Sequence, residues 1–260
     1  MTFVFLSGAG FEPFQHWPIW RFLLEGLWIS VQIALYSIAV SLVIGIVMSV
    51  ARLAPSRPLR WLAATYVEVF RATPLLLLLF FIFFGAARLD LSILRDIPLL
   101  SGLVDDAGHL DRMPAATAAL SLYNSAVIAE IMRAGILSIS KGIIEASRAL
   151  GLTYLQSMRY VALPIALRRM APGLVSQLVT LYKDTSLASI LSIAELLRRG
   201  RIIYDNPAYN NTIEVLLVVA MMYFIPCYAL SLVAQRLEQA PATRVVKGAG
   251  LPADLTIKAG

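Results

Sequence analysis

"EASRALGLTYLQSMRYVALP", residues 145–164, is a polar stretch that lies between two long apolar runs. It carries charges at Glu145, Arg148 and Arg159, and Gly151 interrupts it. The chain around it is strongly hydrophobic: 59% of the 260 residues are apolar, 15% are charged, and the mean hydropathy is +0.76. A soluble domain is closer to half apolar and a quarter charged, so this composition indicates an integral membrane protein.

Five apolar runs are long enough to cross a membrane, for which a helix needs roughly 20 mainly apolar residues. We therefore expect an all-α membrane protein with five transmembrane helices. Their approximate ranges are 22–50, 61–87, 114–137, 164–190 and 211–237.

The basic residues orient these spans. Arginine and lysine follow the first span, surround residues 139–169 and trail the last span. Because cytoplasmic loops carry an excess of both residues, the three groups predict an N-terminus outside and a C-terminus inside. The 88–112 loop on the opposite side is acidic on balance, and we expect it to be periplasmic. Arg198, Arg199 and Arg201 oppose this orientation, because they fall in an outer loop.

In this orientation the opening stretch is a cytoplasmic helix between the third and fourth spans. Gly142 and Gly151 are expected to set bends, because glycine and proline are the strongest local interruptions of regular structure. Pro164 is expected to end the segment where the fourth span begins.

Several polar residues fall inside the predicted spans, where a charge costs at least about 2.5 kcal/mol on insertion scales. Glu68 with Arg71, and Glu130 with Arg133, stand three apart on one helical face and can form ion pairs. For each pair, a structural role and a transport role both remain open.

A second polar group, Lys-Asp-Thr-Ser at 183–186, predicts a helix break of the kind that lines a transport cavity. Such groups suit an amino-acid zwitterion, because a guanidinium binds a carboxylate in bidentate fashion and carboxylates accept an ammonium. The candidate substrate-path residues are Glu68, Arg71, Thr73, Asn124, Glu130, Lys183, Asp184, Thr185 and Ser186.

Several function classes lack their motifs. The sequence has no G-x-x-x-x-G-K-[ST] phosphate loop and no hydrolase or metalloprotease pattern, so we expect no catalytic residue, metal or ATP site. Cys227 is the single cysteine, which excludes a disulfide, and we expect it to be a buried core residue. The net charge of +6 does not indicate nucleic acid, because no basic run is interleaved with stacking aromatics. Transport would need an ion gradient or energy from a partner.

The polar stretch resembles the EAA loop of the membrane permease subunits of bacterial ABC importers. The family pattern is E-A-A, three residues, G, nine residues, I, one residue and L-P. The sequence keeps this spacing, with serine in place of the second alanine and valine in place of isoleucine. The matching residues are Glu145, Ala146, Ser147, Gly151, Val161, Leu163 and Pro164.

Three further segments resemble the polar-amino-acid branch of that family, the histidine, glutamine and glutamate/aspartate permeases. They are "VEVFRATPLLLLLFF" (67–81), "AEIMRAGILSISKG" (129–142) and "LYKDTSLASILSIAEL" (181–196). The likeness covers residues 22–238, which we expect to be the permease domain, followed by a flexible cytoplasmic tail at 239–260.

The resemblance implies a non-enzymatic permease subunit in the bacterial cytoplasmic (inner) membrane that imports a polar amino acid. It implies that the EAA helix docks into a groove on a separate ATPase subunit, which binds ATP and magnesium. It further implies a second permease subunit, identical or related, and an external amino-acid-binding protein. The implied ATPase-coupling residues are Glu145, Ala146, Ser147, Arg148, Gly151, Leu163 and Pro164.

Two other functions fit the sequence less well. An ion-coupled secondary transporter would use Glu68, Glu130 or Asp184 as its proton or sodium site. A membrane subunit without transport activity would assemble complexes through residues 139–164. An exposed cytoplasmic helix and the lack of an energy source in the chain favour the importer.

Overall fold

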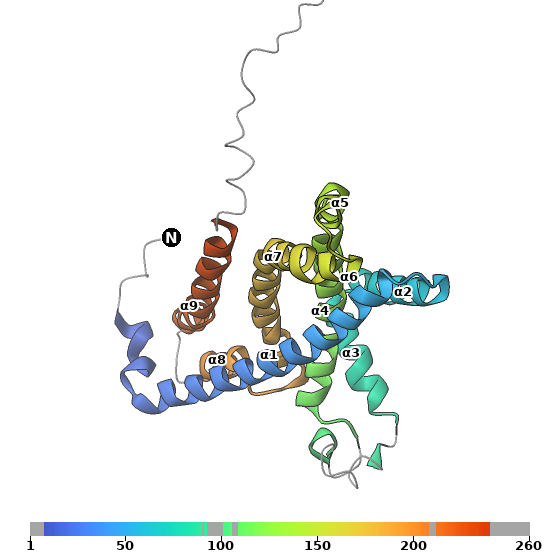
Figure 1. Ribbon diagram of the computed structural model, residues 1–260. Coiled ribbons are helices and arrows are strands. Elements are labelled where there is room, and N and C mark those ends of the chain that lie inside the picture. The colour runs from blue at the N-terminus through green and yellow to red at the C-terminus, as the bar shows by residue number, and fades with distance from the viewer. Residues whose placement is uncertain (1–7, 90, 93–100, 106–108, 208–211, 240–260) are drawn as a thin grey trace, which may run out of the picture.

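The computed structural model describes residues 8–89, 91–92, 101–105, 109–207 and 212–239. This part of the chain contains no strand beyond an isolated bridge between Val104 and Leu110, so the predicted all-α fold is confirmed. Residues 240–260 of the predicted tail and much of the acidic 88–112 loop lie outside the described residues. The elements, labelled as in Figure 1, are η1 (Gly8–Gln15), α1 (Trp17–Arg52), α2 (Arg57–Ala72), α3 (Leu75–Ala86), η3 (Ser101–Leu103), α4 (Arg112–Leu137), α5 (Lys141–Ala149), α6 (Tyr154–Ser157), the π-helical turn η4 (Met158–Ala162), α7 (Leu163–Asp184), η5 (Thr185–Leu191), α8 (Leu196–Tyr204) and α9 (Thr212–Gln239).

The long helix α1 packs against α4, and small residues permit the close approach. Gly45 lies so near α4 that a Cβ atom there would be 2.6 Å from Cγ2 of Ile128. The hydroxyl of Ser41 donates to the carbonyl of Ser121 at 3.3 Å. Small residues at helix contacts are typical of membrane proteins, because they let the backbones approach and pack. Since α2, α3 and α7 also contact α4, this helix is the centre of the fold.

The predicted span at 61–87 is wrong as a single straight helix. It consists of α2 and α3, which meet at a bend of 105°. The break falls at Thr73, whose backbone is extended, and Pro74 follows it. A residue before proline is disfavoured in the helical conformation, which explains the position of the break. Glu68 and Arg71 consequently lie on α2 beside a bend, rather than at the middle of a continuous membrane helix.

Three single helices among the described residues are long and apolar enough to cross a membrane, namely α1, α4 and α9. They correspond to the first, third and fifth predicted spans, and the bent pair α2–α3 adds a fourth if it counts as one span. The predicted fourth span contains α7, which has 22 residues but carries four charged ones, Arg168, Arg169, Lys183 and Asp184.

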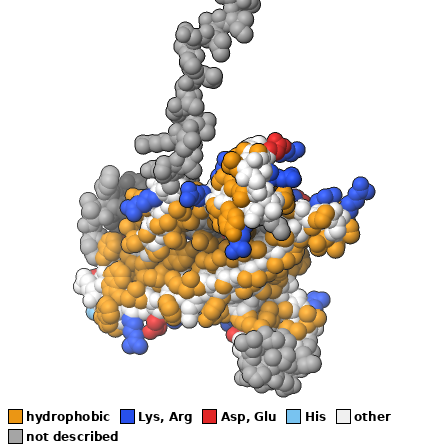
Figure 2. All heavy atoms as spheres, viewed as in Figure 1, with side chains coloured by type: hydrophobic (Ala, Val, Ile, Leu, Met, Phe, Trp, Pro, Cys, Tyr) orange, Lys and Arg blue, Asp and Glu red, His pale blue; other side chains and the backbone are white. Residues whose placement is uncertain are grey.

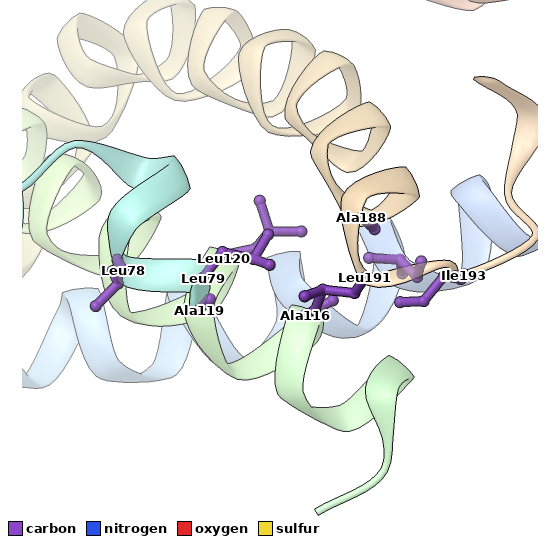
Figure 3. Packing of buried hydrophobic residues seen from close by; sticks show 9 residues of the cluster. Leu78, Leu79, Ala116, Ala119, Leu120, Ala188, Leu191 and Ile193 are labelled. Carbon is purple, nitrogen blue, oxygen red and sulfur yellow. The ribbon is translucent and has the colours of Figure 1, made fainter. Parts of the chain in front are cut away.

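A cluster of buried apolar side chains joins α1, α3, α4 and η5 (Figure 3). Leu78 and Leu79 of α3 lie against Ala116, Ala119 and Leu120 of α4. Leu191 and Ile193 complete the cluster from the chain that follows α7. This packing holds the bent segment α2–α3 and the end of α7 against the same central helix.

The outer surface is rich in exposed apolar side chains. Trp28 is 59% exposed and Phe81 is 70% exposed. Figure 2 shows hydrophobic side chains over most of the middle of one face. Lys and Arg side chains gather around α5 and α2. Exposed apolar surface of this extent marks contact with lipid or protein. Cys227 is buried, as predicted.

Candidate functional site

The 145–164 stretch is not one helix, as the sequence suggested, but two helical pieces that meet at Gly151. Helix α5 ends there with Gly151 at φ +88°, a left-handed conformation that glycine adopts without steric cost. The N–H of Gly151 donates to the carbonyl of Arg148, and the N–H of Leu152 donates to that of Ser147. These bonds satisfy carbonyls at the helix end. The predicted bend at Gly151 is thus confirmed.

The second piece begins with a reciprocal cap. The N–H of Thr153 donates to Gln156 Oε1 at 2.8 Å, and the N–H of Gln156 donates to Thr153 Oγ1 at 3.3 Å. Helical backbone then continues from Ser157 through the π-helical turn η4 into α7. Pro164 lies in the first turn of α7, where we expected a span to begin, but it does not end the segment. Gly142 lies in the first turn of α5 with no positive φ, so the bend expected there is wrong.

The side chains of α5 divide into one that faces inward and several that face outward. Ser147 is buried, and its hydroxyl donates to the carbonyl of Ile144 at 2.7 Å. Glu145, Ala146 and Arg148 are exposed, and Leu150 is 85% exposed. Helix α5 thus presents both charged and apolar side chains to its surroundings.

The rest of the outward surface lies on the second piece. Exposed large apolar side chains continue there at Tyr154, Tyr160 and Leu163. The guanidinium of Arg169 donates to the carbonyl and hydroxyl of Ser138, which ties α7 to the end of α4. Both ends of the projecting segment are therefore fixed to the helices that carry it.

A charged cluster lies where α1, α2 and α4 meet. Glu130 accepts hydrogen bonds from Arg133, the ion pair that the sequence predicted, and from Arg52 of α1, which it did not. Glu68 and Arg71 are exposed, and within the described chain they form no ion pair with each other. Their charges act instead on Arg133 and Glu130, respectively.

Asn124 lies deeper in the fold and faces no open space. It is fully buried, its amide donates to the carbonyl of Leu120 at 2.8 Å, and its Oδ1 accepts from Gln177 Nε2 at 2.6 Å. This contact joins α4 to α7. Gln177 was missed because a single amide in an apolar helix gives no sequence signal for its partner.

The predicted helix break at 183–186 is confirmed, because α7 ends at Asp184 and the 3-10 helix η5 follows. Lys183 is exposed and Asp184 is half-buried, whereas Thr185 is buried and donates to the carbonyl of Tyr182 at 2.7 Å. Ser186 is half-buried, and its carbonyl accepts from the hydroxyl of Ser189 at 2.7 Å. The side chains thus point in different directions around the break.

Apart from the buried Asn124, the candidate path residues form two groups in this structure. Glu68, Arg71 and Glu130 lie in the charged cluster, and Thr73 lies at the nearby end of α2, where its hydroxyl donates to the carbonyl of Val69. The break at 183–186 leads into η5, which packs beside Ala116–Leu120 of α4. Ten residues of α4 separate Leu120 from Glu130, or about 15 Å at the helical rise. The two groups are therefore not brought into one site.

Sequence reasoning also missed a buried carboxylate at the junction of α1, α8 and α9. Glu195 caps α8: its carboxylate accepts from the N–H groups of Leu197 at 2.9 Å and Arg198 at 2.8 Å. It also accepts from the hydroxyls of Tyr223 at 2.6 Å and Ser30 at 3.2 Å. Burial raises the pKa of the Glu195 carboxyl, and these hydrogen bonds oppose that rise. The sequence signal for this cap was an acidic residue directly before the two leucines that begin α8.

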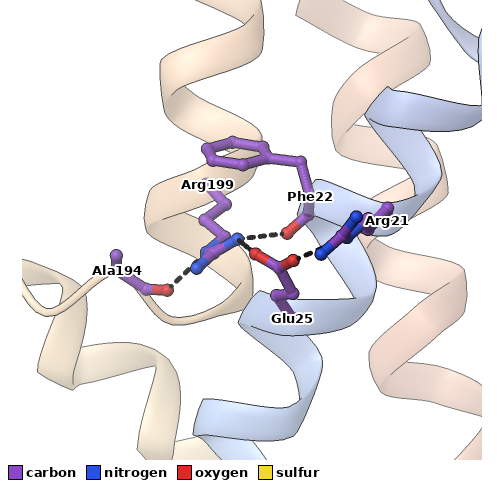
Figure 4. Close-up of polar contacts among 5 residues, drawn as sticks. All are labelled: Arg21, Phe22, Glu25, Ala194 and Arg199. Carbon is purple, nitrogen blue, oxygen red and sulfur yellow. Dashed lines mark hydrogen bonds and ion pairs between the residues drawn. The ribbon is translucent and has the colours of Figure 1, made fainter.

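Arg199 accounts for part of the basic loop that opposed the predicted orientation. Its guanidinium donates to the carbonyls of Ala194 and Phe22 and to the carboxylate of Glu25, as Figure 4 shows. The side chain is only 12% exposed. Arg201 forms an ion pair with Asp205. Arg199 and Arg201 thus each have a local acidic partner, but they still count against the predicted orientation, because acidic residues contribute little to the positive-inside bias.

Membrane-crossing helices around a central α4, with a projecting two-piece helical segment between α4 and α7, define an integral membrane transport component. The chain belongs to the family described as binding-protein-dependent transport system inner membrane component, whose model matches residues 17–242. The resemblance to amino-acid ABC permeases is thereby confirmed.

Individual relatives support this assignment. The probable glutamine ABC transporter permease protein GlnP of Bacillus subtilis is 38% identical over 218 residues, which cover 84% of this chain and 92% of the relative. The glutamate/aspartate import permease protein GltK of Escherichia coli is 34% identical over 230 residues, covering 86% and 96%. A crystal structure of an amino acid ABC transporter with histidines is 26% identical, with a TM-score of 0.71 over 92% of this chain and 99% of that chain.

Proposed function

We propose that this chain is the permease subunit of an ATP-driven importer that carries a polar amino acid across the bacterial cytoplasmic membrane. The observation that carries the proposal is the projecting segment 141–162, with the left-handed turn at Gly151 and the exposed Leu150 beside it. A separate ATPase subunit docks on this segment and binds the ATP and magnesium. The names of the relatives, which include glutamine and glutamate/aspartate permeases, support a polar amino acid as the substrate.

The proposed membrane arrangement has five spans, with the N-terminus outside and the C-terminus inside. The bent pair α2–α3 counts as the second span and α7 as the fourth. In Figure 1, α5 and the final turns of α9 lie toward one end of the molecule, while η3 lies toward the opposite end. This separation supports one cytoplasmic side and one external side. Arg198, Arg199 and Arg201 oppose this orientation, but the basic groups that follow the first span, surround residues 139–169 and trail the last span outweigh them.

The proposed substrate path runs between the two polar groups. Arg71 and Glu130 act at its inner part, and the break at 183–186 acts at its outer part. Because about 15 Å separates the two levels along α4, an amino acid would meet the groups in succession rather than together. This agrees with alternating access, in which ligands and partner states shift a conformational equilibrium.

The remaining proposed partners are a second permease subunit and an external amino-acid-binding protein. Exposed apolar side chains along α1, including Trp28 and Val43, supply surface for lipid and for the second subunit. The acidic outer loop is the proposed contact for the binding protein. Two subunits around a shared path would let the ATPases close both halves together.

The proposal is tested in vesicles that contain the chain, its ATPase subunit and the amino-acid-binding protein. We expect ATP hydrolysis to rise when binding protein and amino acid are both added, and labelled amino acid to accumulate only with ATP. The chain alone, given a proton or sodium gradient, is the control. Accumulation by the chain alone would overturn the proposal in favour of ion-coupled transport.

The substrate path is tested by Arg71→Ala and Asp184→Ala, one from each polar group. Both variants are expected to lower uptake by about tenfold or more, the loss that follows when one charged contact of about 1.4 kcal/mol is removed. Binding of the ATPase subunit should be unchanged, which copurification measures. Loss of that assembly would instead assign the residues a structural role.

A further inference from the structure

A basic pocket lies at the inner end of α1, beside the charged cluster around Glu130. Its volume is about 540 Å³, and its lining includes four arginines, Arg52 of α1, Arg57 and Arg60 of α2, and Arg133 of α4. Three separate helices thus direct guanidinium groups to one hollow.

The pocket carries excess positive charge. Glu130 neutralises part of it through Arg52 and Arg133, which leaves three positive charges from four arginines and one carboxylate. Glu68 and Arg71 act on the same cluster but cancel each other. Arg57 and Arg60 are exposed, and neither forms an ion pair with a described residue. Two guanidinium groups therefore remain available for an anion.

The start of α2 reinforces this preference. Ser56 precedes the helix without a side-chain cap, and the first turn contains no acidic residue. The first N–H groups of a helix lack intrahelical partners and carry the positive end of the helix dipole, and since Pro58 has no N–H, Arg57 and Leu59 supply these donors here. Phosphate oxygens satisfy both these groups and planar guanidinium forks.

The surroundings of the pocket are those of a membrane interface. Trp61, which lines the hollow, is 68% exposed, and the neighbouring Leu62 is 60% exposed. Figure 2 shows basic and hydrophobic side chains side by side at this end of the molecule. Arg57 and Trp61 stand four residues apart on one face of α2, so guanidinium groups and the indole ring line the same hollow. Exposed tryptophan is typical of the membrane interface, where basic pockets bind lipid head groups.

We propose that this pocket binds the phosphate of an anionic phospholipid from the inner leaflet. The phosphate lies between Arg57, Arg60 and the start of α2, and the acyl chains lie along Trp61 and Leu62. The bound lipid links α1, α2 and α4 at the level of the Glu130 cluster. The inference rests on the orientation in the proposed function, and the two arginines that hold the phosphate, Arg57 and Arg60, are not among the candidate path residues.

The test measures lipid retention by native mass spectrometry and thermal unfolding of the purified chain alone. Phosphatidylglycerol, phosphatidylcholine and inorganic phosphate are added separately to the wild type, to Arg57→Gln/Arg60→Gln and to Lys141→Gln/Arg148→Gln. The last variant removes the same charge from exposed positions on α5. We expect phosphatidylglycerol alone to be retained and to raise the unfolding temperature. Retention should fall by about tenfold or more in the pocket variant and stay unchanged in the α5 variant.

Equal retention by both double variants would overturn the proposal. Equal stabilisation by inorganic phosphate would assign the site to a free anion and overturn the lipid as its occupant. If copurification shows that the pocket variant no longer binds the ATPase subunit, while the variant still retains the lipid, the pocket is a protein interface and the proposal fails. Because the lipid measurements need no ATPase, binding protein or amino acid, their outcome is independent of the proposed transport function.

Discussion

The junction around Glu195 and the projecting segment 141–162 use polar residues in opposite ways. At the junction, one buried carboxylate accepts four hydrogen bonds, from α1, α8 and α9. On the projecting segment, Glu145 and Arg148 are exposed, and Leu150 stands 85% exposed beside them. The first region has its hydrogen bonds within the chain, and the second leaves its side chains exposed, where we propose that the ATPase subunit docks. Substitutions should therefore affect stability in the first region and assembly in the second.

The largest loss of stability is expected for Glu195→Ala. The substitution removes the acceptor of two backbone N–H groups and of the Tyr223 hydroxyl, at a cost of about 3 kcal/mol, whereas the Ser30 hydroxyl keeps the carbonyl of Gly26. Thermal unfolding of the detergent-solubilised protein measures the change. Glu145→Ala, at an exposed position on α5, is the matched control and should change stability by less than about 0.5 kcal/mol. Equal effects of the two substitutions would break the contrast between the regions.

Gly26→Ala is expected to destabilise the same junction by about 1–3 kcal/mol through overpacking. A Cβ there would lie 2.7 Å from Cδ of Arg199 and 3.0 Å from the backbone of Leu196. Gly142→Ala on α5 meets no atom within 4 Å, so it should leave stability unchanged or raise it by up to about 1 kcal/mol. Denaturant titration of both variants, each followed by tryptophan fluorescence, compares them. A stable Gly26→Ala protein would show that α1 and α8 are free to separate.

Gly151→Ala is expected to cost about 1 kcal/mol, because alanine is strained at the φ of +88° found there. The substitution favours continuation of α5 and so changes the angle between the two pieces of the projecting segment 141–162. ATP hydrolysis stimulated by amino acid should therefore fall by more than stability alone explains. Gly151→Asn, which tolerates the left-handed conformation better, should restore part of the coupling. Unchanged coupling in the alanine variant would contradict a role for this turn.

The smallest effect on stability is expected for Leu150→Ser, within about 0.5 kcal/mol, because the side chain is already exposed. Its effect on assembly should nevertheless be large, about tenfold weaker binding of the ATPase subunit, as expected for an apolar anchor at an interface. Copurification at graded ATPase concentrations measures it. Leu89→Ser, 57% exposed after α3, is the control and should not alter binding. Loss of binding in both variants would contradict a specific contact between Leu150 and the ATPase subunit.

The sequence predicted most reliably what depends on local pattern. Apolar length located α1, α4 and α9, and the polar run at 183–186 located the end of α7. The i, i+3 spacing of Glu130 and Arg133 predicted their ion pair, because residues three apart share a helix face. Gly151 predicted a turn, because glycine adopts the left-handed conformation without steric cost.

Predictions failed where two local signals competed. The 61–87 run has the length of a span, but Pro74 imposes an extended backbone on Thr73, and the helix bends by 105° there. Pro164 was expected to end a helical segment, yet helical backbone continues through it from the π-helical turn η4 into α7. The pattern of apolar and polar residues could not distinguish a proline that breaks a helix, as at Pro74, from one within continuous helical backbone, as at Pro164.

The sequence by itself determined that this protein lies in a membrane, where its three long apolar helices lie along the chain, and which family it resembles. Each of these follows from residues that are close in the chain. Only the tertiary structure decided that Arg52 joins Glu130 and that Ser30 and Tyr223 meet at Glu195. It also separated the candidate path residues into two levels of α4. Partners distant in sequence are chosen by how the helices pack, and a single sequence records no sign of that choice.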